Sequence, residues 1–450
     1  MGVGNSGGGA APRAVKWSLA FSEYKTENAQ VHYRSRALES VLAAYVDTFP
    51  AVLLTGPRQA GKTTLLRHFA HERFGDDLAV VSFDTPSEVA SFRQDPDLFF
   101  ANRPSPLLLD ELQQVPDIFP YLKREVDRAP SRFRFLLSGS QHFPLMRGVT
   151  ESLAGRAGVL ELWPFSHQEV VGASVPRTLE LLERPERLGD LAGTRWPAND
   201  PDDLLPRMLS GGYPVPLLRG AGAPWFASYR QTYILRDVRE LSQVADLGLF
   251  DRFVVLAASR TGMIVNRSEV GRSLGVDDKT AERWFSLLET SYQGFWLPAW
   301  HGNVTKRLVR RRKWVASDSG LCLHLQALRE ADTVLAAPHF GALFESFVLS
   351  EIRKLFGHGG LPWAGHHWRT ASGQEVDLVL PVGRRLVPIE VKHGASPRAR
   401  AARGLRAFRR TYGDQAPVGV LISMHPVVEE VERGVWNLPL GLLLAGLSGD

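Results

Sequence analysis

The sequence predicts an α/β protein of several domains, the first of them built on a parallel β-sheet. Short apolar runs at 51–55, 78–83, 106–110 and 133–138 alternate with polar segments of helix length, which is typical of a doubly wound sheet. A glycine-rich loop directly follows the first run. Near the C-terminus, two short strands, Val376–Pro381 and Leu386–Lys392, come after a helical segment and predict a second, smaller α/β domain.

The composition excludes several classes of protein. The chain of 450 residues is 44% hydrophobic and 22% charged, as globular domains are, so it is not disordered throughout. Its single cysteine, Cys322, excludes a disulfide-stapled secreted scaffold and indicates a reducing, cytoplasmic location. No run reaches the roughly 18 to 20 apolar residues that a membrane-spanning helix needs, so we expect no membrane partner.

The glycine-rich loop has the spacing of a phosphate-binding loop. Residues 56–63 read Gly-Pro-Arg-Gln-Ala-Gly-Lys-Thr, which is GxxxxGK[ST] between a strand and a helical segment. The glycines let backbone N–H groups point at phosphates, the lysine reaches the β- and γ-phosphates, and the threonine hydroxyl binds Mg²⁺. The loop predicts a triphosphate and Mg²⁺ as ligands, bound by Gly56, Pro57, Arg58, Gln59, Ala60, Gly61, Lys62, Thr63 and Thr64.

Two carboxylates end the third apolar run. Residues 107–111 read Leu-Leu-Leu-Asp-Glu, so Asp110 and Glu111 stand at a strand tip. A carboxylate at that position beside the loop holds Mg²⁺, which we assign to Asp110, and the next one orients and deprotonates the attacking water, which we assign to Glu111. The alternative is that the pair only caps a helix.

The segment after the fourth run offers two further catalytic candidates. Ser140 at the strand tip is placed to contact the γ-phosphate or the water, with Gln141 as the second choice and a plain turn as the alternative. Arg156 follows soon after, and an arginine offered to the γ-phosphate stabilises the transition state. A structural ion pair is the alternative for Arg156, and the sequence does not decide whether it acts within its own chain or on a neighbour.

These motifs, in this order, resemble a prokaryotic AAA+-type P-loop ATPase family. They are Gly-Pro-Arg-Gln-x-Gly-Lys-Thr-Thr, Leu-Asp-Glu-x-Gln, Ser-Gly-Ser and Ser-Leu-Ala-Gly-Arg, and the segment Tyr233–Val238 also matches. The resemblance covers about Leu38 to Ser423, and members of the family carry a C-terminal nuclease-like domain of uncharacterised function. The resemblance implies ATP as the nucleotide.

A helix-turn-helix pattern follows a helix-rich block at Trp225–Ser259. Ser268 is expected to cap a first helix, Gly275 to permit the turn and Asp277 to open a second helix. The hairpin at Phe295–Val315 predicts a wing. The second helix carries more acids than bases, which favours a wing that grips a nucleic-acid backbone, or a module that packs on the ATPase, over reading of bases.

Basic residues are concentrated in two places although the formal net charge is only +5. One cluster is Lys306–Lys313 and the other is Arg398–Arg410, where Arg403, Arg406 and Arg410 are spaced for one helix face. Such clusters attract phosphate backbones, so we expect nucleic acid, DNA before RNA, as a partner. A solvated basic face is the alternative.

The C-terminal strands carry acids with the spacing of a metal-dependent site. Asp377 lies on the first strand, and alternation places Glu390 and Lys392 on one face of the second. Glu345, on the preceding helix, can join them, and such a cluster binds one or two Mg²⁺ or Mn²⁺ ions. These residues match the PD-(D/E)xK nuclease pattern and predict a restriction-endonuclease-like fold. A binding relic and an ion-pair network without metal are the alternatives.

Together these observations predict an ATP-hydrolysing P-loop ATPase that couples its nucleotide state to a winged-helix and nuclease-like tail. The alternative is a non-cleaving, nucleotide-gated switch that serves a protein partner, and a homo-oligomer is compatible with either. Prolines between Ser174 and Pro206 mark a domain boundary. The predicted segments are a disordered leader at 1–14, the ATPase domain at 15–173, a linker and helical connector at 174–245, a winged helix-turn-helix domain at 246–332 and the nuclease-like domain at 333–450.

Overall fold

The computed structural model describes most of the chain, within one compact unit that begins at Tyr33. The predicted leader at 1–14, Gln141, Leu235–Val238 and most of the cluster Lys306–Lys313 lie outside the described residues. The described residues are 33–75, 78–103, 105–128, 133–140, 148–149, 151–173, 175–197, 201–234, 246–302, 311–396 and 400–446.

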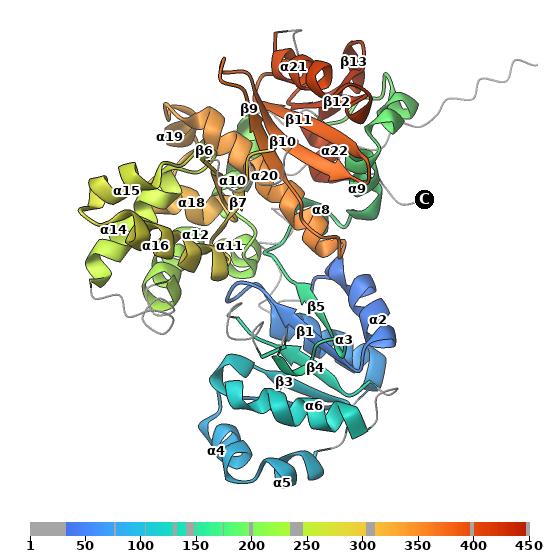
Figure 1. Cartoon of the computed structure of the whole chain (residues 1–450), viewed down its shortest axis with the longest axis vertical. Coiled ribbons are helices and arrows are strands. Elements are labelled where there is room, and N and C mark those ends of the chain that lie inside the picture. The colour runs from blue at the N-terminus through green and yellow to red at the C-terminus, as the bar shows by residue number, and fades with distance from the viewer. Residues whose placement is uncertain are drawn as a thin grey trace, which may run out of the picture. The chain divides into compact units, whose positions relative to one another are not determined.

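The first domain is a five-stranded sheet in which all neighbouring strands are parallel (Figure 1). Its order is β2-β3-β4-β1-β5, which confirms the predicted parallel sheet and its four apolar strands. The fifth strand was not predicted, because its glycine-containing sequence alternates between half-buried and buried residues and lacks a long apolar run. The strands are β1 (Ala51–Thr55), β2 (Ala79–Ser82), β3 (Leu107–Asp110), β4 (Phe135–Ser138) and β5 (Ala157–Glu161).

Helices cover both faces of this sheet because alternate strand residues are apolar on each side. Val52 and Leu54 of β1 pack with α2 and α3, whereas Ala51 and Leu53 pack with the helices on the other face. The helical elements are α2 (Leu38–Thr48), α3 (Lys62–Phe74), α4 (Pro86–Gln94), α5 (Pro96–Ala101), η2 (Leu112–Gln114), η3 (Pro116–Ile118) and α6 (Phe119–Arg128).

The helical connector runs from the sheet toward the C-terminal half of the chain. It contains the proline-rich stretch, and its last helix continues into one turn of π-helix. The elements are α8 (His167–Val171), α9 (Val175–Glu183), η4 (Pro185–Leu191), α10 (Pro201–Ser210), α11 (Pro214–Arg219), α12 (Gly222–Tyr229) and η5 (Arg230–Ile234).

The predicted helix-turn-helix is present and is followed by a small antiparallel sheet of order β6-β8-β7. Gly275 makes the turn with a left-handed φ of 71°, and Asp277 caps the second helix by accepting from the Thr280 N–H. The expected cap of the first helix was wrong: Asn266 is the residue before that helix, and Ser268 instead donates to Asp278. The elements are α14 (Leu247–Ser259), β6 (Met263–Ile264), α15 (Arg267–Leu274), α16 (Asp278–Thr290), β7 (Gly294–Leu297), β8 (Lys313–Ala316), α18 (Ser319–Leu325) and α19 (Ala331–Leu335).

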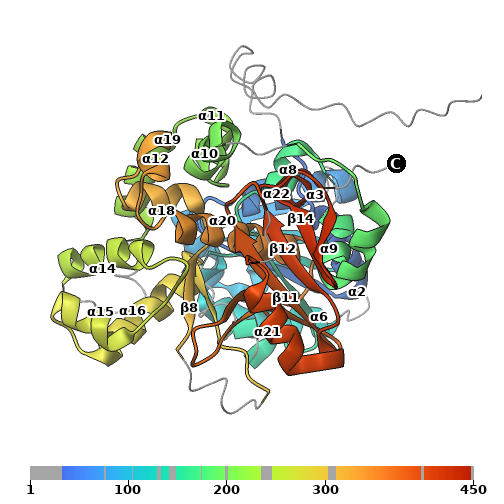
Figure 2. The ribbon, with the colours of Figure 1, turned by 90° about the horizontal axis from the view of Figure 1, so that it is seen from above.

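The C-terminal domain is a mixed sheet of order β13-β14-β12-β11-β10-β9 between two helices (Figure 2). Apolar residues of α20 pack on one face of this sheet and those of α21 on the other. Both predicted strands are confirmed. The elements are α20 (Phe340–His358), β9 (His366–Arg369), β10 (Glu375–Val382), β11 (Arg385–Lys392), α21 (Arg403–Tyr412), η6 (Gly413–Gln415), β12 (Gly419–Ser423), β13 (Glu429–Glu432), β14 (Val435–Pro439) and α22 (Leu440–Ala445).

None of the described helices has the length and apolar character needed to cross a membrane.

Candidate nucleotide-binding site and acidic cluster

The predicted phosphate loop joins the end of β1 to the start of α3. Gly56 and Gly61 have φ angles of 145° and 96°, which favour glycine. A Cβ on Gly56 would lie 2.1 Å from the carbonyl oxygen of Leu162, so no side chain fits there. The loop therefore has the compact backbone, followed by a helix N-terminus, that phosphate binding requires.

The polar residues at the loop end are already in contact with one another. The buried Lys62 donates to the carbonyl oxygens of Gly56 at 3.0 Å and Pro57 at 2.9 Å, within its own loop. Thr63 Oγ1 donates to Asp110 Oδ2 at 2.9 Å, and Ser138 donates to the other carboxylate oxygen of Asp110. A hydroxyl and a carboxylate oxygen at this place are the donor set that Mg²⁺ prefers, so these residues fit the ion.

Glu111 and Ser140 are brought together by a side chain that the sequence did not single out. Glu111 has a left-handed φ of 59°, which is uncommon for a residue with a Cβ. Its carboxylate accepts from the amide of Gln113, and the oxygen of the same amide accepts from the Ser140 N–H at 3.2 Å. Glu111 makes no side-chain cap to the short helix after it, so the capping alternative does not hold.

Arg156 is not brought to the phosphate loop of its own chain. It directly precedes β5, whose start pairs with the start of β1, whereas the loop follows the end of β1. Arg156 therefore lies at the N-terminal end of the parallel strands, whereas the loop lies at their C-terminal end. Its Nε forms an ion pair with Asp127 Oδ1 at 2.6 Å.

A buried arginine upstream of α2 contacts the loop from behind. Arg36 donates to the carbonyl oxygen of Ala60 at 3.0 Å and forms an ion pair with Glu169 at 2.9 Å. His358, at the end of α20, places its Nδ1 3.0 Å from the Glu169 carboxylate. Burial alone would raise the pKa of Glu169, but Arg36 and His358 outweigh burial and hold that pKa far below its usual range. The loop is thus joined to the C-terminal domain through Arg36, Glu169 and His358.

Three tyrosines from outside the first sheet also contact the loop or the strand before it. Tyr233 accepts from Gln59 Nε2 at 2.8 Å, and Tyr229 donates to the carbonyl oxygen of Arg58 at 3.3 Å. The hydroxyl of Tyr292 lies 2.7 Å from that of Thr55, the last residue of β1. Among these only Tyr233 had a sequence signal, because it belongs to the matching connector motif.

The C-terminal acids converge as the strand pattern predicted. Lys392 Nζ donates to Glu390 Oε1 at 2.6 Å, and the Val391 N–H donates to Asp377 Oδ2 at 2.9 Å. Glu345 reaches the same place from α20. The second Oε of Glu390 is buried and has no hydrogen-bond partner among the described residues.

The metal site expected at these acids finds no support among the described residues. Among the described residues, no group of three or more His, Cys, Asp or Glu side chains is arranged to hold a metal ion. The ammonium of Lys313, from β8, instead lies 2.5 Å from Glu345 Oε1 and 3.4 Å from Asp377 Oδ1. In this structure a lysine therefore supplies positive charge beside Glu345 and Asp377. The metal site at Glu345, Asp377 and Glu390 stays a prediction. Sequence reasoning counted Lys313 only within a basic cluster.

Proton affinities in this cluster reflect three carboxylates sharing two ammonium groups. Burial, and then the neighbouring Asp377, raise the pKa of Glu345 to about 8 against the opposing effect of Lys313. Burial and Asp377 likewise raise the pKa of Glu390. Burial lowers the pKa of Lys313, but Glu345 and Asp377 outweigh burial and raise it, so this lysine stays charged.

Comparison with known families identifies three successive matches. An AAA domain model matches residues 48–171, and two domains of unknown function, DUF8612 and DUF4143, match residues 201–332 and 340–443. The first match confirms the P-loop ATPase part of the resemblance. The last names no activity, so the nuclease-like part stays a prediction.

Two curated mycobacterial proteins are similar over most of the chain. They are "Uncharacterized protein Rv2008c" of Mycobacterium tuberculosis and "Uncharacterized protein Mb2031c" of Mycobacterium bovis. Each is 30% identical over 352 residues, which cover 77% of this chain and 71% of the relative. The chain belongs to the family of these two proteins, and its first domain is an AAA domain of the P-loop ATPase class.

Two of the solved structures that resemble this chain are remote from it. The Walker-type ATPase PABY2304 of Pyrococcus abyssi is 15% identical with a TM-score of 0.41, covering 66% of this chain and 99% of its own. A mutant of RuvB from Thermotoga maritima is 18% identical with a TM-score of 0.28, covering 57% of this chain and 88% of its own. At these scores neither carries an argument about this protein.

Proposed function

We propose that this protein binds and hydrolyses ATP with Mg²⁺. The observation that carries the proposal is the hydrogen bond between Thr63 and Asp110 beside the glycine loop, because it brings together the two oxygen ligands that the ion needs. Lys62 binds the β- and γ-phosphates once it leaves the loop carbonyl oxygens. Mg²⁺, when bound, supplies charge stabilisation to the phosphates.

Glu111 orients and deprotonates the attacking water, and Ser140 contacts the γ-phosphate or that water. Gln113 positions both, because its amide bonds to the carboxylate of Glu111 and to the backbone of Ser140. Arg156, at the far edge of the sheet, acts on the nucleotide of a second copy in a homo-oligomer.

The test of the nucleotide assignment is Lys62→Ala, measured as ATP turnover and as ATP binding by calorimetry. We expect turnover to be abolished, because the substitution removes the ammonium that faces the phosphates. Full turnover in the purified variant would refute the assignment. Arg67→Ala, on the same helix α3 but outside the loop motif, is the matched control and is expected to leave turnover unchanged.

The nucleotide state is coupled to the rest of the chain. Support comes from the contacts of Arg36, Tyr229, Tyr233 and Tyr292, which join the loop or β1 to the connector, the helix-turn-helix and α20. Binding of phosphates repositions Lys62 and the loop backbone, and these contacts carry the change outward. We propose that hydrolysis resets the connector and the C-terminal domains.

The partner is proposed to be nucleic acid, and DNA in preference to RNA. Support comes from the helix-turn-helix followed by a hairpin, as in a winged helix, and from the exposed Arg403 and Arg410 on α21. Arg406 is less available, since it forms an ion pair with Glu432. Fluorescence anisotropy with labelled duplex DNA tests this proposal. A DNA affinity that changes with neither ATP nor the salt concentration would contradict it.

We propose that the C-terminal domain does not cleave its partner. One observation favours the non-cleaving alternative. Lys313 forms ion pairs with Glu345 and Asp377, two of the acids that would bind the metal ion in a nuclease site. Circular DNA incubated with Mg²⁺ or Mn²⁺ tests this proposal. We expect no nicking by the wild type, and nicking that is lost in Glu390→Ala would establish a nuclease instead. A protein partner reset by hydrolysis would leave DNA binding absent and ATP turnover intact.

A further inference from the structure

The acidic cluster is closed by a lysine from a different domain. Lys313 is the first residue of β8, which pairs on both sides, with β6 and with β7. Its side chain is only 7% exposed, and the side chain of Asp377 is 4% exposed. A buried ammonium at 2.5 and 3.4 Å from two carboxylate oxygens occupies the place that a metal ion would take between them.

Few oxygens of Asp377 and Glu390 are left to bind a second cation beside Lys313. Asp377 uses one oxygen for Lys313 and the other for the Val391 N–H. Glu390 uses one oxygen for Lys392. Its other oxygen is buried and has no hydrogen-bond partner among the described residues, so it is the acceptor left for a further cation. The site is therefore built for cations, and its residues favour binding one if Lys313 is removed.

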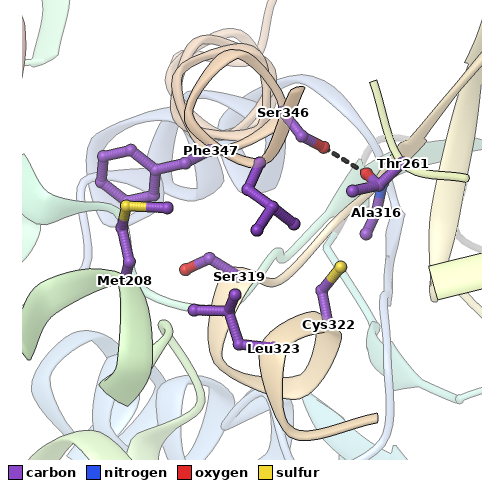
Figure 3. A pocket seen from close by; sticks show the side chains of 9 residues that line it. Met208, Thr261, Ala316, Ser319, Cys322, Leu323, Ser346 and Phe347 are labelled. Atoms are coloured by element: carbon purple, nitrogen blue, oxygen red, sulfur yellow. Dashed lines mark hydrogen bonds between the residues drawn. The ribbon is translucent and has the colours of Figure 1, made fainter. Parts of the chain in front are cut away.

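Two hydrogen bonds join α20 to residues around the sheet that contains Lys313. Ser346, next to Glu345 on α20, hydrogen-bonds with Thr261, and Ser350 donates to the carbonyl oxygen of Ser317 at 2.6 Å. Figure 3 shows Ser346 and Thr261 facing each other beside a small cavity lined by Cys322. That cavity, about 10 Å³, barely admits one water molecule, so the seam between β8 and α20 is tightly packed.

We propose that Lys313 is the resident cation of the Glu345–Asp377–Glu390 cluster and prevents divalent metal from binding there. The C-terminal domain is thereby tied to the helix-turn-helix domain and holds no metal. This inference rests on the non-cleaving function proposed above, and its test is independent of ATP turnover and of DNA.

The test is Mn²⁺ binding to nucleotide-free protein, measured by calorimetry and by the electron paramagnetic resonance signal of bound Mn²⁺. We expect Lys313→Met to bind one Mn²⁺ at least about tenfold more tightly than the wild type, because the competing ammonium is gone. A tenfold change in affinity corresponds to about 1.4 kcal/mol. Adding Asp377→Asn to Lys313→Met removes the new site. Lys313→Arg, which keeps the charge, is the matched control and gains none.

Two results would overturn the inference. One is Mn²⁺ binding by the wild type that Asp377→Asn abolishes. The other is a folded Lys313→Met variant with no gain in Mn²⁺ affinity. Lys313→Gln, whose amide can still donate to one carboxylate, replaces the Met variant if that variant does not fold. Its melting temperature is expected to rise with Mn²⁺ while that of the wild type does not, and an unchanged melting temperature would also overturn the inference.

Discussion

Thr55 and Tyr292 stand 237 residues apart in the chain, yet their hydroxyl oxygens are 2.7 Å apart in a buried contact. Thr55 ends the strand that leads into the phosphate loop, and Tyr292 follows the second helix of the helix-turn-helix. Tyr292 also packs its ring against Trp163, just beyond β5. The helix-turn-helix domain is therefore in direct contact with the strand whose end the nucleotide would move.

Tyr292→Phe removes this hydroxyl and tests the coupling. We expect the free energy of unfolding to fall by about 1 to 3 kcal/mol, because a buried hydrogen-bond partner is lost. Stimulation of ATP turnover by DNA is expected to be lost while ATP affinity stays the same. Denaturant unfolding and turnover with and without DNA measure these effects. Tyr121→Phe, on α6, is the control, and equal effects from both variants would contradict the coupling.

Glu111→Gln is expected to stop hydrolysis but preserve ATP binding. The amide keeps the size of the side chain but cannot accept the proton of the attacking water, so turnover falls by about 10²- to 10⁴-fold. Calorimetry and a phosphate-release assay separate binding from chemistry. Asp117→Asn, an exposed nearby acid, is the matched control. Loss of ATP affinity in Glu111→Gln would indicate a role in binding rather than in catalysis.

Gln113→Ala tests the positioning of Glu111. We expect turnover to fall by about 10- to 100-fold with unchanged ATP affinity, since a misplaced catalytic group loses this much. Gln113→Glu keeps an acceptor for the Ser140 N–H but repels Glu111, so it is expected to be at least as slow. If Gln113→Glu has normal turnover, the contact between Gln113 and Glu111 has no catalytic role.

Glu169→Gln tests the buried contact behind the loop. The variant leaves Arg36 with an uncompensated buried charge, which costs about 3 to 5 kcal/mol of unfolding free energy at neutral pH. Because the pKa of Glu169 is lower in the folded protein than the unfolded value of 4.5, its contribution is present above pH 4.5 and is lost as the pH falls below that value. Urea unfolding at pH 7 and at successive pH values below 4.5 should show the two proteins converging as the pH falls toward the folded-state pKa of Glu169.

The control for this prediction is an exposed ion pair. Glu186 pairs with Arg385 at 2.7 Å, but both side chains are more than a third exposed. Glu186→Gln is expected to cost less than about 1 kcal/mol. A smaller loss from Glu169→Gln than from this control would show that the buried contact does not stabilise the fold.

Local sequence patterns were sufficient to predict most helices and strands and the site residues next to them in the sequence. The apolar run before Gly56 predicted β1, and the period-2 alternation around Glu390 predicted which strand residues face the acidic cluster. The helix cap at Asp277 was likewise readable from its position. The strand β5 was missed because its apolar residues alternate too briefly, between Ala157 and Glu161, to differ from a loop.

The contacts that join domains were not predictable in the same way. Arg36 precedes a helix and has no motif, and its partners Glu169 and His358 lie more than 100 residues away. Lys313 was visible only as one base among several, because nothing in β8 indicates that its neighbours in space are Glu345 and Asp377. Such pairings depend on how separate elements pack, which a single sequence does not encode locally.

The placement of Arg156 at the far edge of its own sheet has a consequence for how the protein behaves on dilution. If this guanidinium serves another subunit, the specific activity per chain depends on protein concentration and falls when copies separate. Two inactive preparations, Lys62→Ala and Arg156→Ala, would then regain turnover on mixing, since each contributes the half-site that the other lacks.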